Sequence, residues 1–166
     1  MKIDDSIYLN QMELEYSNIN EFHSKLEQKA YTMIGIIGVV MSIESSIILS
    51  LNFKVEMLFL VNSNSLLFLI FLSSIISFLI SMFLFLFSLK DNNFKIMPNS
   101  DSIIDYYEYD YDEIEFYQTM LGDYQVSIKN NLNLVRKKYI YTYYGFIPFE
   151  IGIIFLIIFI IGYIMV

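Results

Sequence analysis

The chain has 166 residues, of which 56% are hydrophobic and 17% charged, with a formal net charge of −8. A soluble domain of this size carries about a quarter charged residues, and so acidic a chain argues against a nucleic-acid duplex or an anionic lipid surface as partner. There are no cysteines, which excludes disulfides and cysteine-ligated metal sites. The clustering of the apolar residues places the chain among membrane proteins.

Three apolar runs are long enough to cross a bilayer, whose hydrocarbon core of about 30 Å needs roughly 20 helical residues. They are residues 33–51, interrupted by Glu44; residues 66–89, which carry no charge; and residues 146–166, with Glu150 near the start. The sequence therefore predicts an all-α integral membrane protein with three transmembrane helices. The first two form a hairpin over residues 33–89, and the third span is residues 146–166.

The basic residues predict the orientation of these spans. Lys25 and Lys29 precede the first span, and only Lys54 lies in the short connection between the first two. The long loop before the third span is richer in basic residues, among them Lys90, Lys95, Arg136, Lys137 and Lys138. The positive-inside rule then places the N-terminus and the long loop in the cytoplasm, with the protein multi-pass in the inner (cytoplasmic) membrane.

The two cytoplasmic segments, residues 1–32 and 90–145, are predicted to carry long amphipathic helices that continue into the spans. In the first segment a stripe with spacings of three and four runs through Met12, Tyr16, Ile19, His23, Leu26, Ala30 and Met33. In the second it runs through Ile114, Tyr117, Leu121, Tyr124, Ile128, Leu132, Val135 and Tyr139. Such seams are typical of helices that pack in bundles.

Glu44 is the most informative single residue, because a carboxylate near the middle of a span is costly unless it meets water, a partner or a proton. It either lines a lumen or lies buried, protonated and hydrogen-bonded to a neighbouring serine. The same span carries a stripe of small residues, Gly35, Gly38, Ser42, Ser45 and Ser46, on the face opposite Glu44. Small faces let helix backbones approach closely in lipid.

The second span carries a stripe of serines, Ser73, Ser74, Ser77, Ser81 and Ser88, within about 100° of each other on a helical projection. One interpretation is hydrogen-bonded helix packing. The other is a hydroxyl-lined pore wall, in which Glu44, Ser73, Ser77 and Ser81 are the intramembrane polar residues.

Two groups in the long loop are candidate sites for solutes. The acidic residues Asp105, Glu108, Asp110 and Asp112 could ring a vestibule and attract cations, as charged rings do in cation channels. Arg136, Lys137, Lys138 and Tyr139 either mark the membrane interface or receive a nucleotide by charge and stacking.

Nothing in the sequence predicts an enzyme. His23 is the only histidine, and there is no zinc-protease motif, nucleophile elbow or phosphate loop. We therefore expect no catalytic residues, no metal and no cofactor.

The layout resembles a known family. A helix ends in Leu26-Glu27-Gln28-Lys29-Ala30 before the first span, and a second helix reads Tyr124-Gln125-Val126-Ser127-Ile128-Lys129-Asn130-Asn131 and continues through Lys137-Lys138-Tyr139 into the last. This resembles the small multi-span membrane effectors of prokaryotic nucleotide-signalled antiphage defence, of the Pycsar, CBASS and Hailong type. The resemblance implies a homo-oligomer, a tetramer in the family, that responds to a nucleotide or oligonucleotide made by a partner nucleotidyltransferase.

The functional hypothesis combines the two lines of argument. It is a homo-oligomeric pore or ion channel that depolarises or permeabilises the host membrane and is gated by a nucleotide through its cytoplasmic helices. Two alternatives stay open: a non-conducting membrane anchor or accessory subunit of a larger complex, and a holin-like lesion former.

Overall fold

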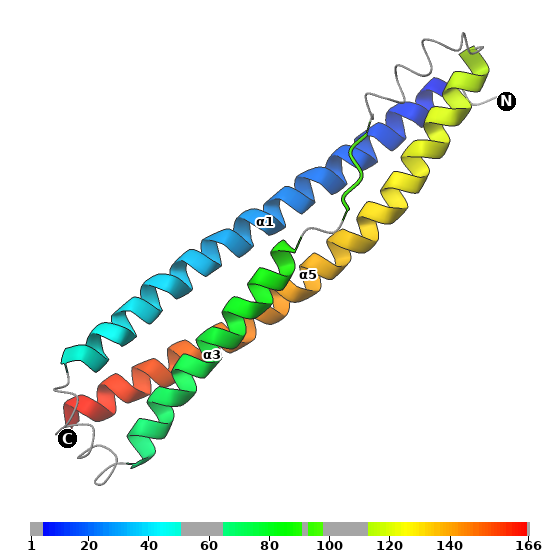
Figure 1. The fold of residues 1–166 in the computed structure, drawn as a ribbon. Coiled ribbons are helices and arrows are strands. Elements are labelled where there is room, and N and C mark those ends of the chain that lie inside the picture. The colour runs from blue at the N-terminus through cyan, green and yellow to red at the C-terminus, as the bar shows by residue number, and fades with distance from the viewer. Residues whose placement is uncertain (1–4, 51–64, 91–92, 98–112, 166) are drawn as a thin grey trace. The chain divides into compact units, whose positions relative to one another are not determined.

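The computed structural model describes residues 5–50, 65–90, 93–97 and 113–165. Its three helices are α1 (Asp5–Ser50), α3 (Ser65–Leu89) and α5 (Glu113–Met165) (Figure 1). Those ranges contain no strand, so the predicted all-α class is confirmed. Each helix includes a stretch long and apolar enough to cross a membrane, in agreement with the predicted number of spans.

α1 is one continuous helix of 46 residues, and α5 is one of 53 residues. A bilayer needs only about 20 residues, so each of them joins an amphipathic stretch to an apolar one, as the two stripes predicted. Pro148 lies inside α5 and does not end it. Its missing N–H leaves the Tyr144 carbonyl without its usual partner within the helix.

The chain forms two compact units. The first, which we call the charged unit, comprises Met1–Lys25 and Asp91–Lys138, and the second, the membrane unit, comprises Leu26–Lys90 and Tyr139–Val166. α1 and α5 each contribute one part to either unit.

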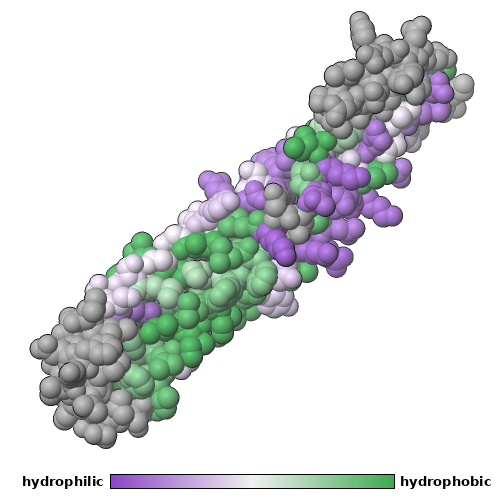
Figure 2. Space-filling view, in the orientation of Figure 1, coloured by the Kyte–Doolittle hydropathy of each residue, from purple (hydrophilic) through white to green (hydrophobic). Residues whose placement is uncertain are grey.

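The membrane unit has an apolar exterior. Many of its large hydrophobic side chains are exposed, among them Val39, Ile43, Leu69, Ile76, Ile80, Phe83, Ile154 and Ile157. Figure 2 shows hydrophobic side chains covering most of the visible face of this unit, apart from residues drawn in grey. Soluble monomers rarely expose a continuous apolar surface of this kind. Exposure to lipid explains it, because the hydrocarbon core is as apolar as these side chains.

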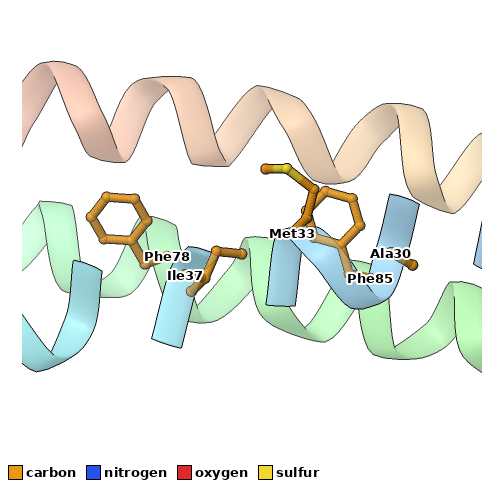
Figure 3. Packing of buried hydrophobic residues seen from close by; sticks show 5 residues of the cluster. All are labelled: Ala30, Met33, Ile37, Phe78 and Phe85. Carbon is orange, nitrogen blue, oxygen red and sulfur yellow. The ribbon is translucent and has the colours of Figure 1, made fainter. Parts of the chain in front are cut away.

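The apolar core of the membrane unit joins all three helices. Its buried members are Ala30, Met33 and Ile37 of α1 and Phe78 and Phe85 of α3 (Figure 3). Half-buried residues of α5, including Phe146, Phe149 and Ile153, pack against them. Phe78 and Phe85 reach from α3 toward α5, where each ring makes an edge-to-face contact, with Phe149 and Phe146 respectively.

The charged unit has a smaller core of Tyr16, Met120, Tyr124 and Ile128. The rings of Tyr16 and Tyr124 meet edge to face at 5.8 Å between centroids. On α1 the predicted stripe is confirmed, because every member from Met12 to Met33 is buried or half-buried.

The predicted stripe on α5 is correct at Tyr124, Ile128 and Val135 and wrong at Ile114, Leu132 and Tyr139, which are exposed. Two polar residues, Asn131 and Lys138, occupy the buried face instead. The prediction followed apolar residues alone, whereas the Asn131 amide lies inside because it binds backbone, as described below.

Candidate functional site

The carboxyl group of Glu44 is buried in the core of the membrane unit, with 2% of the residue exposed. Glu44 follows Ala30, Met33 and Ile37 on the inner face of α1 at helical spacing. Its Oε1 lies 2.6 Å from the Ser74 hydroxyl of α3, and that hydroxyl lies 3.0 Å from the Gly152 carbonyl of α5. Its Oε2 has no hydrogen-bond partner among the described residues. One carboxyl, one hydroxyl and one carbonyl therefore connect all three helices.

Ser74 belongs to a seven-residue repeat along α3. Phenylalanine recurs at Phe71, Phe78 and Phe85, and serine recurs three residues after each of them, at Ser74, Ser81 and Ser88. All six residues are buried. The Ser81 hydroxyl donates to the Gly145 carbonyl at 2.7 Å, and the Ser88 hydroxyl lies 2.7 Å from that of Thr142. Sequence reasoning grouped the serines but missed this repeat, whose signal is the matching spacing of the phenylalanines.

The same glycines that accept the serine bonds also make room for the aromatic rings. A Cβ added at Gly152 would lie 2.9 Å from the Phe78 ring, and one added at Gly145 would lie 3.0 Å from the Phe85 ring. Each of these two turns thus forms a clasp, in which a serine bonds a glycine carbonyl and the next phenylalanine of the repeat packs on that glycine. Sequence reasoning did not single out either glycine.

Close packing contributes more to these clasps than the hydrogen bonds do. Hydrogen bonds between membrane helices contribute about 0.6 kcal/mol each on average, whereas replacing a buried phenylalanine by alanine costs about 3–5 kcal/mol. The serines mainly allow α3 and α5 to come close without leaving a polar group unpaired.

The other predicted pore residues of α3 are less buried than Ser74 and Ser81. Ser73 and Ser77 are half-buried, and the Ser73 hydroxyl donates to the Leu69 carbonyl of its own helix. Ser81 and Glu44 lie inside the packing of a single chain. Two of the four predicted pore residues are therefore fully buried within one chain, whereas Ser73 and Ser77 are only partly buried.

The small-residue face of α1 is uncovered by the described parts of the chain. Gly35, Gly38, Ser42, Ser45 and Ser46 are all exposed, and a Cβ added at either glycine would meet nothing within 4 Å. The three serine hydroxyls donate to carbonyls one turn back in α1. This face thus presents a shallow surface whose polar groups are already satisfied.

In the charged unit, residues 93–97 are held against α1 and α5 by side chains. The Asn131 amide accepts from the Lys95 N–H at 3.0 Å and donates to the Lys95 carbonyl at 2.8 Å. The Tyr16 hydroxyl donates to the same carbonyl and accepts from the Met97 N–H, both at 2.9 Å. A groove of about 480 Å³ lies beside this segment, lined by Phe94, Lys95, Ile96, Met97, Asp123, Val126 and Ser127.

The predicted nucleotide-binding residues do not all lie on the exposed face of α5. Arg136, Lys137 and Tyr139 are exposed, whereas Lys138 is buried, with 2% of the residue exposed. The vestibule prediction for Asp105, Glu108, Asp110 and Asp112 lies outside the described residues. Within the described ranges no three acidic, histidine or cysteine side chains come together as a metal site would require.

Comparison with protein-family models, with curated proteins and with solved structures gives no match to this chain. The class of protein therefore rests on the geometry. Three helices that each hold a long apolar stretch, together with the apolar exterior of the membrane unit, define a multi-pass helical membrane protein.

Proposed function

We propose that this chain is a self-associating pore or ion channel that depolarises or permeabilises the host membrane. In this proposal it is the effector of an antiphage system and responds to a nucleotide signal. The observation that carries the self-association is the uncovered small face of α1, because in lipid such faces bring helix backbones together. A second copy of the chain would supply a helix that packs against this face. A tetramer is the assembly that the family resemblance implies.

The described packing corresponds to the closed state of this proposed pore. Glu44, Ser74 and Ser81 are engaged inside one chain, so none of them is available to ions. Separation of α1 from α3 would release the Glu44 carboxyl group of every copy, and separation of α3 from α5 would release the two hydroxyls. Rings of such groups around an axis are how cation channels line their pores.

Gating by a nucleotide is assigned to the charged unit. The exposed cations Arg136 and Lys137 on α5 offer positive charge for phosphates, and Lys95 lines the groove beside residues 93–97. These residues lie in the segments that the basic-residue distribution predicts to be cytoplasmic, where a signal made by a partner nucleotidyltransferase would be found.

A non-conducting membrane anchor is the second candidate. The observation that favours it is that the Ser74 and Ser81 hydroxyls already meet carbonyls of the same chain. A membrane unit of this kind is self-sufficient, and the charged unit would then bind a partner protein.

The mass of the purified protein in detergent, measured by native mass spectrometry or light scattering, separates the two candidates. We expect a single closed oligomer for the natural chain and smaller species for Gly38→Leu. That substitution fills open space in the monomer and therefore leaves its fold intact. The matched control is Val39→Leu, an exposed neighbour that is already large. A clean monomer for the natural chain would contradict the pore and favour the anchor.

The defence role needs a measurement in infected cells. We expect a potential-sensitive dye to report depolarisation of bacteria that carry this chain with its partner nucleotidyltransferase, only after phage infection. The Gly38→Leu variant should not depolarise them. Depolarisation without infection, at the same expression level, would point to a holin-like lesion former instead.

A further inference from the structure

We propose that Glu44, Ser74 and the Gly152 carbonyl form a proton-binding site, and that the bound proton holds α1 against the other two helices of the membrane unit. The inference concerns the packing within one chain. It does not depend on whether the assembled protein conducts.

The Ser74 hydroxyl carries one hydrogen and lies within bonding distance of two acceptors, the Glu44 Oε1 at 2.6 Å and the Gly152 carbonyl at 3.0 Å. If Glu44 is ionised, only one of these contacts holds a hydrogen, and the other sets two lone pairs against each other. If Glu44 is protonated, its hydroxyl donates to Ser74 and Ser74 donates to Gly152, so both contacts are bonds.

Ser81 occupies the position in α3 that is equivalent to Ser74. Ser81 lies seven residues after Ser74 in the α3 repeat, and its hydroxyl donates to the Gly145 carbonyl at 2.7 Å. Among the described residues no carboxyl group bonds Ser81, so this contact shows where a serine of the repeat directs its hydrogen. By the same geometry Ser74 donates to Gly152, which leaves Glu44 as the donor to Ser74.

The other carboxyl oxygen of Glu44, Oε2, is also buried. Oε2 has no hydrogen-bond partner among the described residues. A neutral acid leaves only a carbonyl oxygen unpaired there, whereas a carboxylate leaves a charge that is nearly unpaired in a buried site. α3 contains no titratable residue, and the span of α5 contains only Glu150, which is exposed, and Tyr163, which stacks on Phe159. No cation from α3 or from this part of α5 therefore compensates a negative charge on Glu44.

The consequence follows from the same bonds. When the proton leaves Glu44 for water, the Ser74 hydrogen turns to the carboxylate, and the Gly152 carbonyl loses its bond from α3. The carboxylate then gains stability by meeting water, which it can reach only if α1 moves. The proton is thus the ligand of this site, and its loss favours separation of α1.

Infrared difference spectroscopy of the reconstituted protein at neutral pH tests the proton directly. We expect a protonated-carboxyl band that is lost in Glu44→Gln, kept in Glu150→Gln, and shifted in Ser74→Ala because the acid loses its acceptor. Ser81→Ala is the matched control and should leave the band in place. If Glu44→Gln removes only carboxylate bands while its helix content stays unchanged, the proposal is overturned.

Spin labels test the movement of α1. The chain has no cysteine, so labels attach only where one is introduced. Val39→Cys on α1 and Ile76→Cys on α3 are exposed positions that disturb no core contact. We expect the distance between the labels to lengthen or broaden at alkaline pH, and to stay fixed in the Glu44→Gln background, where the amide still donates to Ser74. An equal response in both backgrounds, or none in the natural chain, would contradict the locking role.

Discussion

The two units of this chain solve the same problem, the joining of segments far apart in sequence, with different chemistry. In the membrane unit, serine hydroxyls bond glycine carbonyls and phenylalanine rings fill the space that those glycines leave. In the charged unit, an amide and a phenol bind the backbone of residues 93–97 beside a core of tyrosine, methionine and isoleucine.

The difference reflects what each environment offers. Between helices in lipid there is no hydrophobic driving force, so close fit and satisfied polar groups decide the packing. In the charged unit the burial of apolar area can stabilise the core directly, and side-chain bonds are needed mainly to fix a segment that has no regular structure. Substitutions in the two units should therefore destabilise the protein for different reasons.

The largest effect is expected for Gly152→Val in the membrane unit. The new side chain collides with the Phe78 ring, which is fully buried, and overpacking of this kind costs about 3 kcal/mol. Gly35→Val introduces the same residue where nothing lies within 4 Å and is the matched control. Unfolding by denaturing detergent measures both. Equal stability of the two variants would contradict the clasp.

Asn131→Ala comes next and tests the charged unit. It removes both side-chain bonds to the Lys95 backbone, and a loss of about 2 kcal/mol follows at roughly 1 kcal/mol per bond. Asn130→Ala is the control, because its contact with the Asn93 carbonyl is longer, at 3.3 Å. Hydrogen exchange at residues 93–97 reports the change. Unaltered protection in Asn131→Ala would show that the amide does not hold the segment.

Gly122→Ala should stabilise the charged unit. Gly122 lies inside α5 with open space around it, and alanine is favoured over glycine in a helix by about 1 kcal/mol. Thermal unfolding monitored by circular dichroism checks the gain. A loss of stability would mean that this face of α5 is covered in the assembled protein.

The smallest effect is the pH dependence of Tyr124. Burial raises the pKa of its phenol, and the negative charge of Glu13 adds to this. The folded unit then keeps a proton that the unfolded chain releases near pH 10, so stability falls as the pH rises above about 10. Tyr124→Phe should flatten that alkaline decline, whereas Tyr8→Phe, at an exposed position, should not. An unchanged slope in Tyr124→Phe would contradict the role of burial.

Much of the fold could be predicted because its signals are local. Length and apolarity identify the spans, and the stripe on α1 marks its inner face from Met12 to Met33. The same method failed at Leu132 and Tyr139, because it assumed that apolar residues define the buried face of α5. Asn131 is buried because its amide bonds the backbone of Lys95, which lies 36 residues away in the sequence.

Only one member of the candidate site, Glu44, could be predicted from the sequence. Glu44 could be found alone, because a carboxyl group inside a span is rare. Its partners could not, because the choice of Ser74 among five serines depends on how α3 is rotated. The phenylalanine repeat carries that information, since Phe71, Phe78 and Phe85 fix the inward face and place Ser74, Ser81 and Ser88 beside it.

Because the repeat on α3 recurs every seven residues, α3 could pack against α5 in more than one register with similar contacts. A slip of one heptad, about 10.5 Å along the axis, would set Phe85 against Gly152 and Phe78 against Phe159, where Phe71 now lies at 4.6 Å. Like contacts would replace like contacts along the middle of the pair. The Ser88–Thr142 bond and the packing of the Phe85 ring on Gly145, both at the end of the repeat, have no such substitute. The contacts at this one end thus distinguish the native register of α3 against α5 from a register displaced by one heptad.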